Sequence, residues 1–278
     1  MAQNYANRIQ PTVDEVFRLK SVTDQIINND IHLDYTGVNS VSIYGVSTVA
    51  ENNYQRSGTN RFGALAELDT TRQTFVLSQD KSFTYSIDRG NYEDSMMITE
   101  VGSTLQRQLE VVCVPNTDKY RLATLGAYGV ANSFLNTIVQ LTGANVYINF
   151  LNAGIQLDEK FVPSGGRVAF VTPPTYGLLK QDSNFIKASD MGQAMLKAGV
   201  VGEVDGVIIV KVPSAYLPAN YGFMLVHKSV LVAPHKFDTF RTLTDVQGID
   251  GWVVEGRRYY DAFVPAQHGV GIWVHKNA

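Results

Sequence analysis

The spacing of apolar residues predicts a long amphipathic helix in the first half of the chain. Beginning at Ser95, five apolar residues recur at intervals of 3, 4, 4 and 3: Ile98, Val101, Leu105, Leu109 and Val112. This spacing places them on one face of a helix, with the polar residues 106–108 opposite. Pro115 is expected to end the helix, because proline lacks the N–H that the next turn requires.

Weaker patterns favour four further helices. They lie at residues 12–17, 116–126, 142–157 and 191–198. The first follows Pro11, which suits a helix start, and the second begins at Asn116 or Thr117 just before Asp118. The stretch 126–141 mixes glycine, asparagine and serine with apolar residues, so its structure is left open.

Residues 37–87 favour extended structure. Residues 37–50 alternate loosely between apolar and polar, and strand-type residues at 74–77 and 83–87 flank a polar turn at 78–81. The last two strands form a predicted hairpin with too few apolar positions for a core of its own. Because an isolated hairpin is marginally stable in water, we expect it to lie on its own domain or on another subunit.

The stretch LDEKFVPSGGRVAFVTPPTYGLL at 157–179 marks the change to a strand-rich second half. It contains a helix end, a turn with Gly165 and Gly166, an apolar strand at 168–171, and a double proline before another helix start. Further strands are expected at 207–212, 223–232, 240–243, 252–263 and 270–274.

Composition excludes several classes of protein. A length of 278 residues allows one large domain or two modest ones. The 23 basic and 26 acidic residues give a net charge of −3 without any block of like charge. Capture of nucleic acid or of an anionic membrane by a basic face is therefore not expected.

The single cysteine, Cys113, excludes an internal disulfide framework and a cysteine-based zinc site, and is expected to be a small packed side chain. No apolar run approaches the roughly 20 residues that cross a bilayer, and the N-terminus has no leader pattern. A soluble, cytosolic protein is therefore expected.

No motif of catalysis or of cofactor binding is present. Gly165-Gly166-Arg167 could form an anion-binding turn, but a strand follows it rather than a helix, which favours a plain tight turn. His268 and His275 have an odd separation and would face opposite sides of a strand, so they are not expected to share a metal. No catalytic, cofactor-binding or metal-binding residue is assigned, and no enzymatic activity is expected.

Carboxylate pairs such as Asp158 with Glu159 are explained by helix capping or solvation. Arg257 and Arg258 lie beside two tyrosines but between Glu255 and Asp261. An inter-subunit ion pair or an exposed strand is therefore favoured over a nucleic-acid patch.

Three stretches, together with the order of elements, resemble a known family. They are the stretch at 157–179, AGVVGEVDGVIIVKVP at 198–213, and the closing strands at 223–275, which contain FMLVHKSVLVAPHKFDTFRTLTDVQ and GWVVEGRRYYDAFVP. A polar arm, a short helix, a hairpin and a long helix precede them. The chain therefore resembles the major capsid proteins of tailed bacteriophages with the Hong Kong 97-type fold, to which encapsulins are related.

The resemblance implies an α+β fold made of an arm, an extended two-stranded loop, a spine helix and two domains. The implied ranges are the N-terminal arm at 1–35, the extended loop near 51–85, the spine helix near 95–112, the peripheral domain at 36–160 and 236–264, and the axial domain at 161–235 and 265–278.

The implied function is that of a coat protein, made in the cytoplasm of a host bacterium and found in the virion. Its copies would form the pentamers and hexamers of an icosahedral shell around double-stranded DNA, without cofactors, sequence-specific DNA binding or membrane contact. A portal, decoration proteins and a separate scaffolding protein would be its partners, or the shell would assemble without scaffold. An encapsulin-type shell, a tail or baseplate protein, and a hydrolase or transferase using His227 or His268 stay open.

Some members of the family that the chain resembles form covalent crosslinks between subunits. Where members of the family crosslink, they use a lysine on the extended loop, whereas Lys81 is the only lysine between residues 21 and 118 here. Neither an asparagine nor a carboxylate partner for it can be assigned. We therefore predict that boiled, reduced particles give a single band on a denaturing gel, and a covalent ladder would contradict this.

Overall fold

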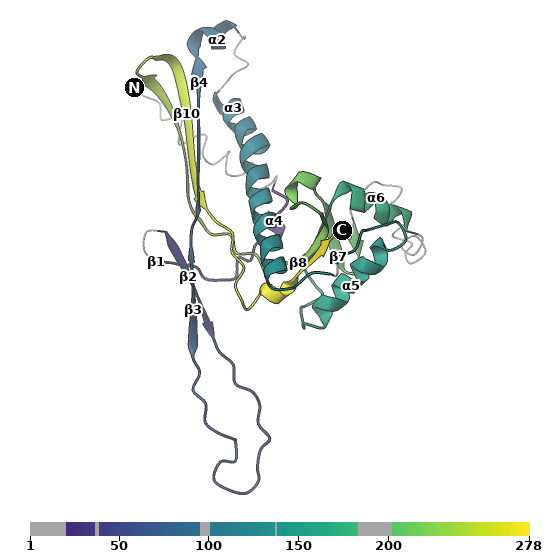
Figure 1. Ribbon diagram of the computed structural model, residues 1–278. Coiled ribbons are helices and arrows are strands. Elements are labelled where there is room, and N and C mark those ends of the chain that lie inside the picture. The colour runs from purple at the N-terminus through teal and green to yellow at the C-terminus, as the bar shows by residue number, and fades with distance from the viewer. Residues whose placement is uncertain (1–20, 37–38, 95–100, 137, 183–201) are drawn as a thin grey trace. The chain divides into compact units, whose positions relative to one another are not determined.

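The computed structural model describes residues 21–36, 39–94, 101–136, 138–182 and 202–278. The chain divides into two compact units (Figure 1). The smaller unit is Asp30–Leu77, and the larger contains the rest of the chain. The predicted helices at 12–17 and 191–198 lie outside the described residues.

The larger unit contains a five-stranded sheet in the order β11-β8-β5-β7-β6. Its strands are β5 (Arg167–Val171), β6 (Glu203–Val204), β7 (Val207–Lys211), β8 (Tyr221–His227) and β11 (Ile272–Lys276). Only β5 and β7 pair in parallel. All five residues of β5 are buried, as expected for a central strand that is covered on both faces.

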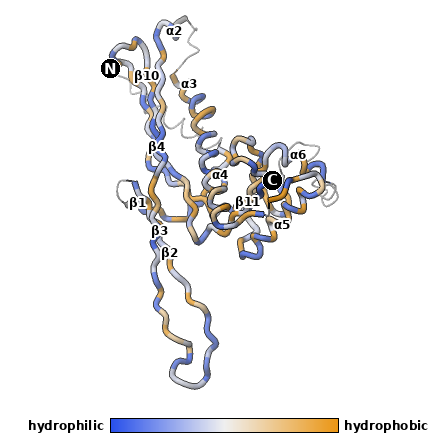
Figure 2. The backbone as a smooth tube through the Cα atoms, in the orientation of Figure 1, coloured by the Kyte–Doolittle hydropathy of each residue, from blue (hydrophilic) through white to orange (hydrophobic). Residues whose placement is uncertain are grey.

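Alternate residues of β5 enter two different cores. Ala169 and Val171 pack in one cluster with residues of α5 (Val146–Asp158) and α6 (Pro173–Gln181). Val168 and Phe170 pack on the opposite face with Leu122 of α4 (Val114–Ala131). The backbone around β11 and α5 is correspondingly rich in hydrophobic residues (Figure 2). The helices therefore cover both faces of this sheet.

A second sheet in the same unit has the order β4-β10-β9. Its antiparallel strands are β4 (Gln79–Asp88), β9 (His235–Val246) and β10 (Ile249–Tyr260), and α2 (Arg89–Asp94) follows β4. Leu105 and Leu109 of the long helix pack against Phe240 and Val254 of this sheet. The predicted amphipathic face of the helix is therefore the one that covers the strands.

The prediction that Pro115 ends the helix is wrong. Helical structure continues through α3 (Val101–Gln108), a π-helical turn (Leu109–Cys113) and α4. In this wider turn the N–H of Val114 donates to the carbonyl of Leu109, five residues earlier. Proline is tolerated in the first turn of a helix, and the widened turn directly before it gives α4 a new first turn.

The π-helical turn also changes which side chains are buried. Val112, predicted on the apolar face, is 39% exposed, whereas Cys113 is buried. A π-helical turn contains an additional residue, so the buried face moves by one position after Leu109. Cys113 is thus a packed side chain, as predicted.

The smaller unit is a three-stranded antiparallel sheet in the order β1-β2-β3. Its strands are β1 (Asp34–Thr36), β2 (Ser40–Val46) and β3 (Thr70–Val76). β2 and β3 pair from Ser40 opposite Val76 to Val46 opposite Thr70, and residues 47–69 connect them.

The predicted pairing of residues 74–77 with 83–87 is wrong. β3 pairs with β2, whereas β4 pairs with β10 in the other unit. Phe83 and Tyr85 of β4 pack against the core beneath α3. A tertiary core therefore selects the partner of β4, and sequence proximity does not.

The remaining expected elements are confirmed with changed limits. The helix expected at 116–126 is part of α4, which continues to Ala131, and the third helix is α5. The strands expected in the second half are β5, β7, β8, β9, β10 and β11. Short 3-10 turns lie at Asp24–Ile26, Ser214–Tyr216 and Gly269–Gly271. In the part of the chain that the structure describes, no helix has the length and apolar character needed to span a bilayer.

His275 predicts a loss of stability in acid. The ring is buried, stacks on Phe223 at 5.0 Å and donates from Nε2 to the carbonyl of Val139. Burial lowers the pKa of His275, although the hydrogen bond to Val139 opposes this. Below the ordinary histidine pKa of about 6.5 the unfolded chain binds the proton more readily, so the free energy of unfolding falls as the pH falls.

Chemical denaturation at about pH 7 and about pH 5 measures this loss. His275→Gln keeps an N–H donor but does not titrate, so its free energy of unfolding should depend less on pH than that of the unchanged chain. An equal pH dependence of the two proteins would rule out His275 as a source of the acid sensitivity.

Candidate functional site

A buried carboxylate on α4 holds the segment that leads into the smaller unit. Asp118 is 1% exposed. It accepts hydrogen bonds from the hydroxyls of Ser21 and Thr23, each at 2.6 Å, and from the backbone N–H of Val22 at 3.0 Å. A buried carboxylate is tolerated when it is well hydrogen-bonded, so this arrangement fixes the segment on the helix.

Arg121 extends this attachment by one helical turn. Its Nη1 donates to Thr23 at 2.9 Å and to the carboxylate of Asp24 at 2.7 Å. The chain is then held by Ile26, which is fully buried, and by Asn28, whose side chain donates to the carbonyl of Ser229. The path of the chain is therefore fixed up to the start of the smaller unit.

A second buried carboxylate, Asp261, fixes the point at which the chain returns. Asp261 is 2% exposed and accepts hydrogen bonds from the backbone N–H of Ser78 and from the hydroxyl of Tyr120, each at 2.6 Å. Burial, together with the hydrogen bond to Asp261, raises the pKa of Tyr120. Since Tyr120 lies on α4, this one helix helps to hold both segments of the larger unit that flank residues 30–77 in the sequence.

The connection at 47–69 carries apolar side chains on its surface. Five of them are at least 49% exposed: Val49, Tyr54, Phe62, Leu65 and Leu68. The rings of Tyr54 and Phe62 meet edge to face at 5.0 Å, and Leu65 is 99% exposed. Burying one large apolar side chain stabilises a complex by about 1.5–3 kcal/mol, so this loop is a candidate contact surface.

Solved structures share the fold of this chain. A structure from Mycobacterium phage Che8 matches with a TM-score of 0.67 and 21% identity over 86% of this chain and 85% of that one. The capsid structure of cyanophage P-SCSP1u matches with a TM-score of 0.75 and 12% identity over 93% of this chain and 88% of that one. The chain has the Hong Kong 97-type capsid fold.

The capsid fold is also seen in a virus-like particle from Pyrococcus furiosus, with a TM-score of 0.58 and 9% identity over 98% of this chain and 99% of that one. No protein-family model and no curated protein matches the sequence. The likeness therefore lies in the fold rather than in the residues.

Within this capsid fold, the Gly165-Gly166-Arg167 turn is structural. Arg167 is buried and donates to the carboxylate of Asp158 at 2.6 Å and to the carbonyl of Pro163 at 2.9 Å. Its guanidinium therefore joins the end of α5 to β5, and the tight-turn interpretation holds.

His227 and His268, the two histidines considered for catalysis, have structural surroundings in the fold. The Nε2 of His227 donates to the carbonyl of Gly165 at 2.9 Å, and its Nδ1 lies 2.7 Å from the hydroxyl of Ser229. Burial lowers the pKa of His227. His268 precedes a 3-10 turn at Gly269–Gly271. Among the described residues, no group of three or more His, Cys, Asp or Glu could hold a metal ion.

Of the two arginines of β10, Arg257 is exposed, as the exposed-strand alternative predicts, whereas Arg258 is buried, which corrects that prediction. Arg257 pairs with Asp80 of β4 at 2.6 Å across the sheet. Arg258 is 4% exposed and lies 3.4 Å from the carboxylate of Asp238 on β9. It also donates to the hydroxyl of Thr117 at 3.1 Å. Arg258 thus ties the sheet to the long helix.

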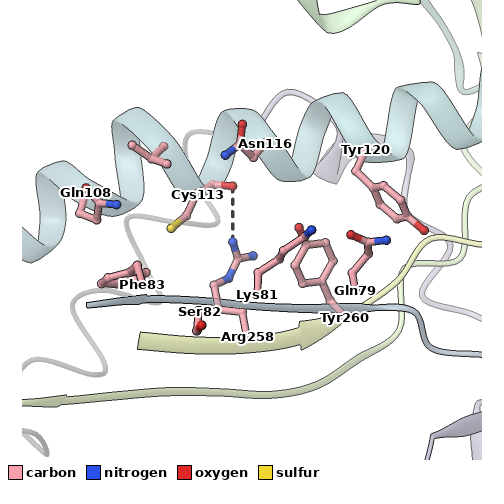
Figure 3. Close-up of a pocket in the computed structure, with 11 residues that line it drawn as sticks. Gln79, Lys81, Ser82, Phe83, Gln108, Cys113, Asn116, Tyr120, Arg258 and Tyr260 are labelled. Atoms are coloured by element: carbon pink, nitrogen blue, oxygen red, sulfur yellow. Dashed lines mark hydrogen bonds between the residues drawn. The ribbon is translucent and has the colours of Figure 1, made fainter. Parts of the chain in front are cut away.

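A groove lies between the long helix and this sheet (Figure 3). Its volume is about 400 Å³. Cys113, Arg258 and Tyr260 form its buried floor, and Lys81 and Asn116 stand at its exposed rim. Burial raises the pKa of the Cys113 thiol.

The attachment at Asp118 predicts a large and local loss of stability on mutation. Asp118→Ala leaves two hydroxyls and one N–H without their acceptor, so the free energy of unfolding should fall by about 2–4 kcal/mol. Chemical denaturation measures the loss, and limited proteolysis should cut the 21–29 segment faster. Glu159→Gln, at the exposed end of α5, should change neither quantity, and equal behaviour of the two variants would contradict the assigned role of Asp118.

Proposed function

We propose that the chain is the major capsid protein of a tailed bacteriophage. Its copies would form pentamers and hexamers of an icosahedral shell around the double-stranded DNA genome. The observation that carries this proposal is the match to a capsid structure over 93% of the chain. The exposed apolar side chains of the 47–69 loop add support, because a shell protein needs surfaces that become buried only on assembly.

In the proposed shell, the 47–69 loop contacts a neighbouring copy. The loop and its receiving surface are different parts of the chain, so the contact is heterologous and closes when the rotation between copies completes a ring. Each copy then gives one loop and receives one. This distribution provides interface area to a chain whose smaller unit has few buried side chains.

We also propose the division into domains that the resemblance implies. The axial domain at 161–235 and 265–278 is supported by the five-stranded sheet, whose strands all lie in these ranges. We place α5 with it, because Phe150 and Leu157 pack in the same core. The peripheral domain at 36–160 and 236–264, from which α5 is then excluded, is supported by the β4-β10-β9 sheet and the long helix that covers it.

In this proposal the protein has a structural rather than a catalytic role. It would be made in the cytoplasm of the host bacterium and end in the virion. A portal, a scaffolding protein and decoration proteins would be its partners. The net charge of −3 suits a container, because a wall without a strong positive field does not trap the packaged genome.

The match to the virus-like particle from Pyrococcus furiosus favours a second candidate, a shell made by a cell around a protein cargo. The contents of purified particles distinguish the two functions. Nuclease-protected DNA inside the shell supports the capsid, whereas a co-purifying protein without DNA supports the cellular compartment.

Assembly of the expressed protein tests the shell directly. Sedimentation should separate a fast fraction, and electron microscopy of that fraction should show closed shells with fivefold and sixfold rings. Only small species under all assembly conditions, with the scaffold included, would contradict the proposed function.

Two loop variants test the assigned contact. Leu65→Asp places a charge where an apolar side chain would be buried on assembly, so the assembled fraction should fall about tenfold or more. Thr59→Asp adds the same charge at an exposed polar position of the loop and serves as the matched control. Both variants should unfold within about 0.5 kcal/mol of the unchanged chain, because both positions are exposed. Equal assembly of the two variants would exclude Leu65 from the interface.

A further inference from the structure

The groove between the long helix and the β4-β10 strands has no part in the function proposed above. Side chains reach it from both sides: Gln108, Cys113, Asn116 and Tyr120 from the helix, and Gln79, Lys81, Phe83, Arg258 and Tyr260 from the strands (Figure 3). Its volume of about 400 Å³ lies in the range of small-molecule sites. Its walls come from two elements of one chain, so the site does not depend on assembly.

The groove lies beside the π-helical turn, where the contacts between helix and sheet change. Up to Cys113 the helix packs on Phe240 and Val254 of the sheet in an apolar cluster. Beyond the turn, Leu122 packs on the five-stranded sheet, and polar contacts such as that of Arg258 with Thr117 join the helix to the first sheet. The groove lies beside these polar contacts.

The charge of the groove favours an anion. Lys81 and Arg258 line it, whereas none of the eleven described residues that line it is an aspartate or a glutamate. Arg258 has Asp238 beside it on β9, which lies outside the lining. Lys81 is exposed at the rim and takes part in none of the ion pairs among the described residues. Of the two cations among the described lining residues, the one outside those ion pairs is therefore at the rim, where a ligand would enter.

The shape of the lining favours a flat apolar body. Three aromatic rings, those of Phe83, Tyr120 and Tyr260, form much of the wall. Three amides, Gln79, Gln108 and Asn116, add hydrogen-bond donors without negative charge. Aromatic walls with a few convergent polar groups are typical of sites for small organic molecules.

We propose that this groove binds a small organic anion with a flat, apolar body. The body lies along the floor of the groove over Arg258, whose guanidinium covers the ring of Tyr260 at 4.9 Å, and the anionic group lies at the rim beside Lys81. Such a ligand contacts the helix and both strands at once, so its binding stabilises the folded chain by mass action.

The test uses the full chain with 2-naphthoate as the probe and 2-naphthalenemethanol as its uncharged counterpart. Titration calorimetry and thermal unfolding should show that naphthoate binds and raises the unfolding temperature, and that the alcohol binds about tenfold more weakly. Absence of naphthoate binding at millimolar concentration, or equal binding of the two compounds, would overturn the proposal.

Three variants locate the site. Lys81→Met should weaken naphthoate binding about tenfold and leave binding of the alcohol unchanged. Lys211→Met removes an exposed lysine of β7, in the five-stranded sheet, whose Nζ lies 5.7 Å from the ring of Tyr176 on α6, and it should bind naphthoate normally. Val112→Trp fills the groove from its exposed rim and should abolish binding of both compounds. Normal naphthoate binding by the Lys81 or the Val112 variant would show that the probe occupies another place, and would refute the assignment.

Discussion

Two buried carboxylates determine the path of the chain through this fold. Asp118 accepts three hydrogen bonds from residues 21–23, and Asp261 accepts hydrogen bonds from Ser78 and from Tyr120. Burying a carboxylate costs free energy unless its oxygens accept hydrogen bonds. Each of the two carboxylates therefore requires its own donor segment of the chain in place. Together with buried Ile26 and the hydrogen bond of Asn28 to Ser229, they fix the segments that precede and follow the Asp30–Leu77 unit.

The helix that carries Asp118 also joins the two sheets of the larger unit. Its first half packs on the β4-β10-β9 sheet and its second half on the five-stranded sheet. One straight helix face cannot serve both sheets, and the π-helical turn before Pro115 changes the buried face between them. Arg258 then fastens the sheet to the helix beside this turn, through Thr117 and the carbonyl of Cys113.

Local patterns in the sequence predict much of this structure. The apolar spacing of Leu105 and Leu109 identifies the long helix, and the all-apolar residues 168–171 identify the central strand. The interpretation of Pro115 as a helix end fails because the wider turn before it is a local geometry that apolar spacing does not encode. The pairing of 74–77 with 83–87 fails because strand partners are chosen by tertiary cores, here the contact of Phe83 with the region beneath α3.

The site depends even more on tertiary structure. Asp118 looks like an ordinary residue of a first helical turn, and only the fold brings residues 21–23 to it. Arg258 looks exposed beside Glu255, but alternation along β10 turns it towards the helix. One sequence signal was available: Asp118 lies four residues before Leu122, on the same side of the helix, where an unpartnered carboxylate would be unfavourable.

In the proposed shell, the residues of the exposed 47–69 loop serve the contact between copies and contribute little to the stability of the folded chain. The pairing of β2 with β3 fixes the positions of its two ends. The entropic cost of closing a loop rises only slowly with the number of residues in the loop. Residues can therefore be inserted or exchanged there at little cost to the stability of the rest of the chain. In the proposed shell, the chemistry of the contact between copies can therefore change within this short stretch alone, while the buried carboxylates and both sheets stay unchanged.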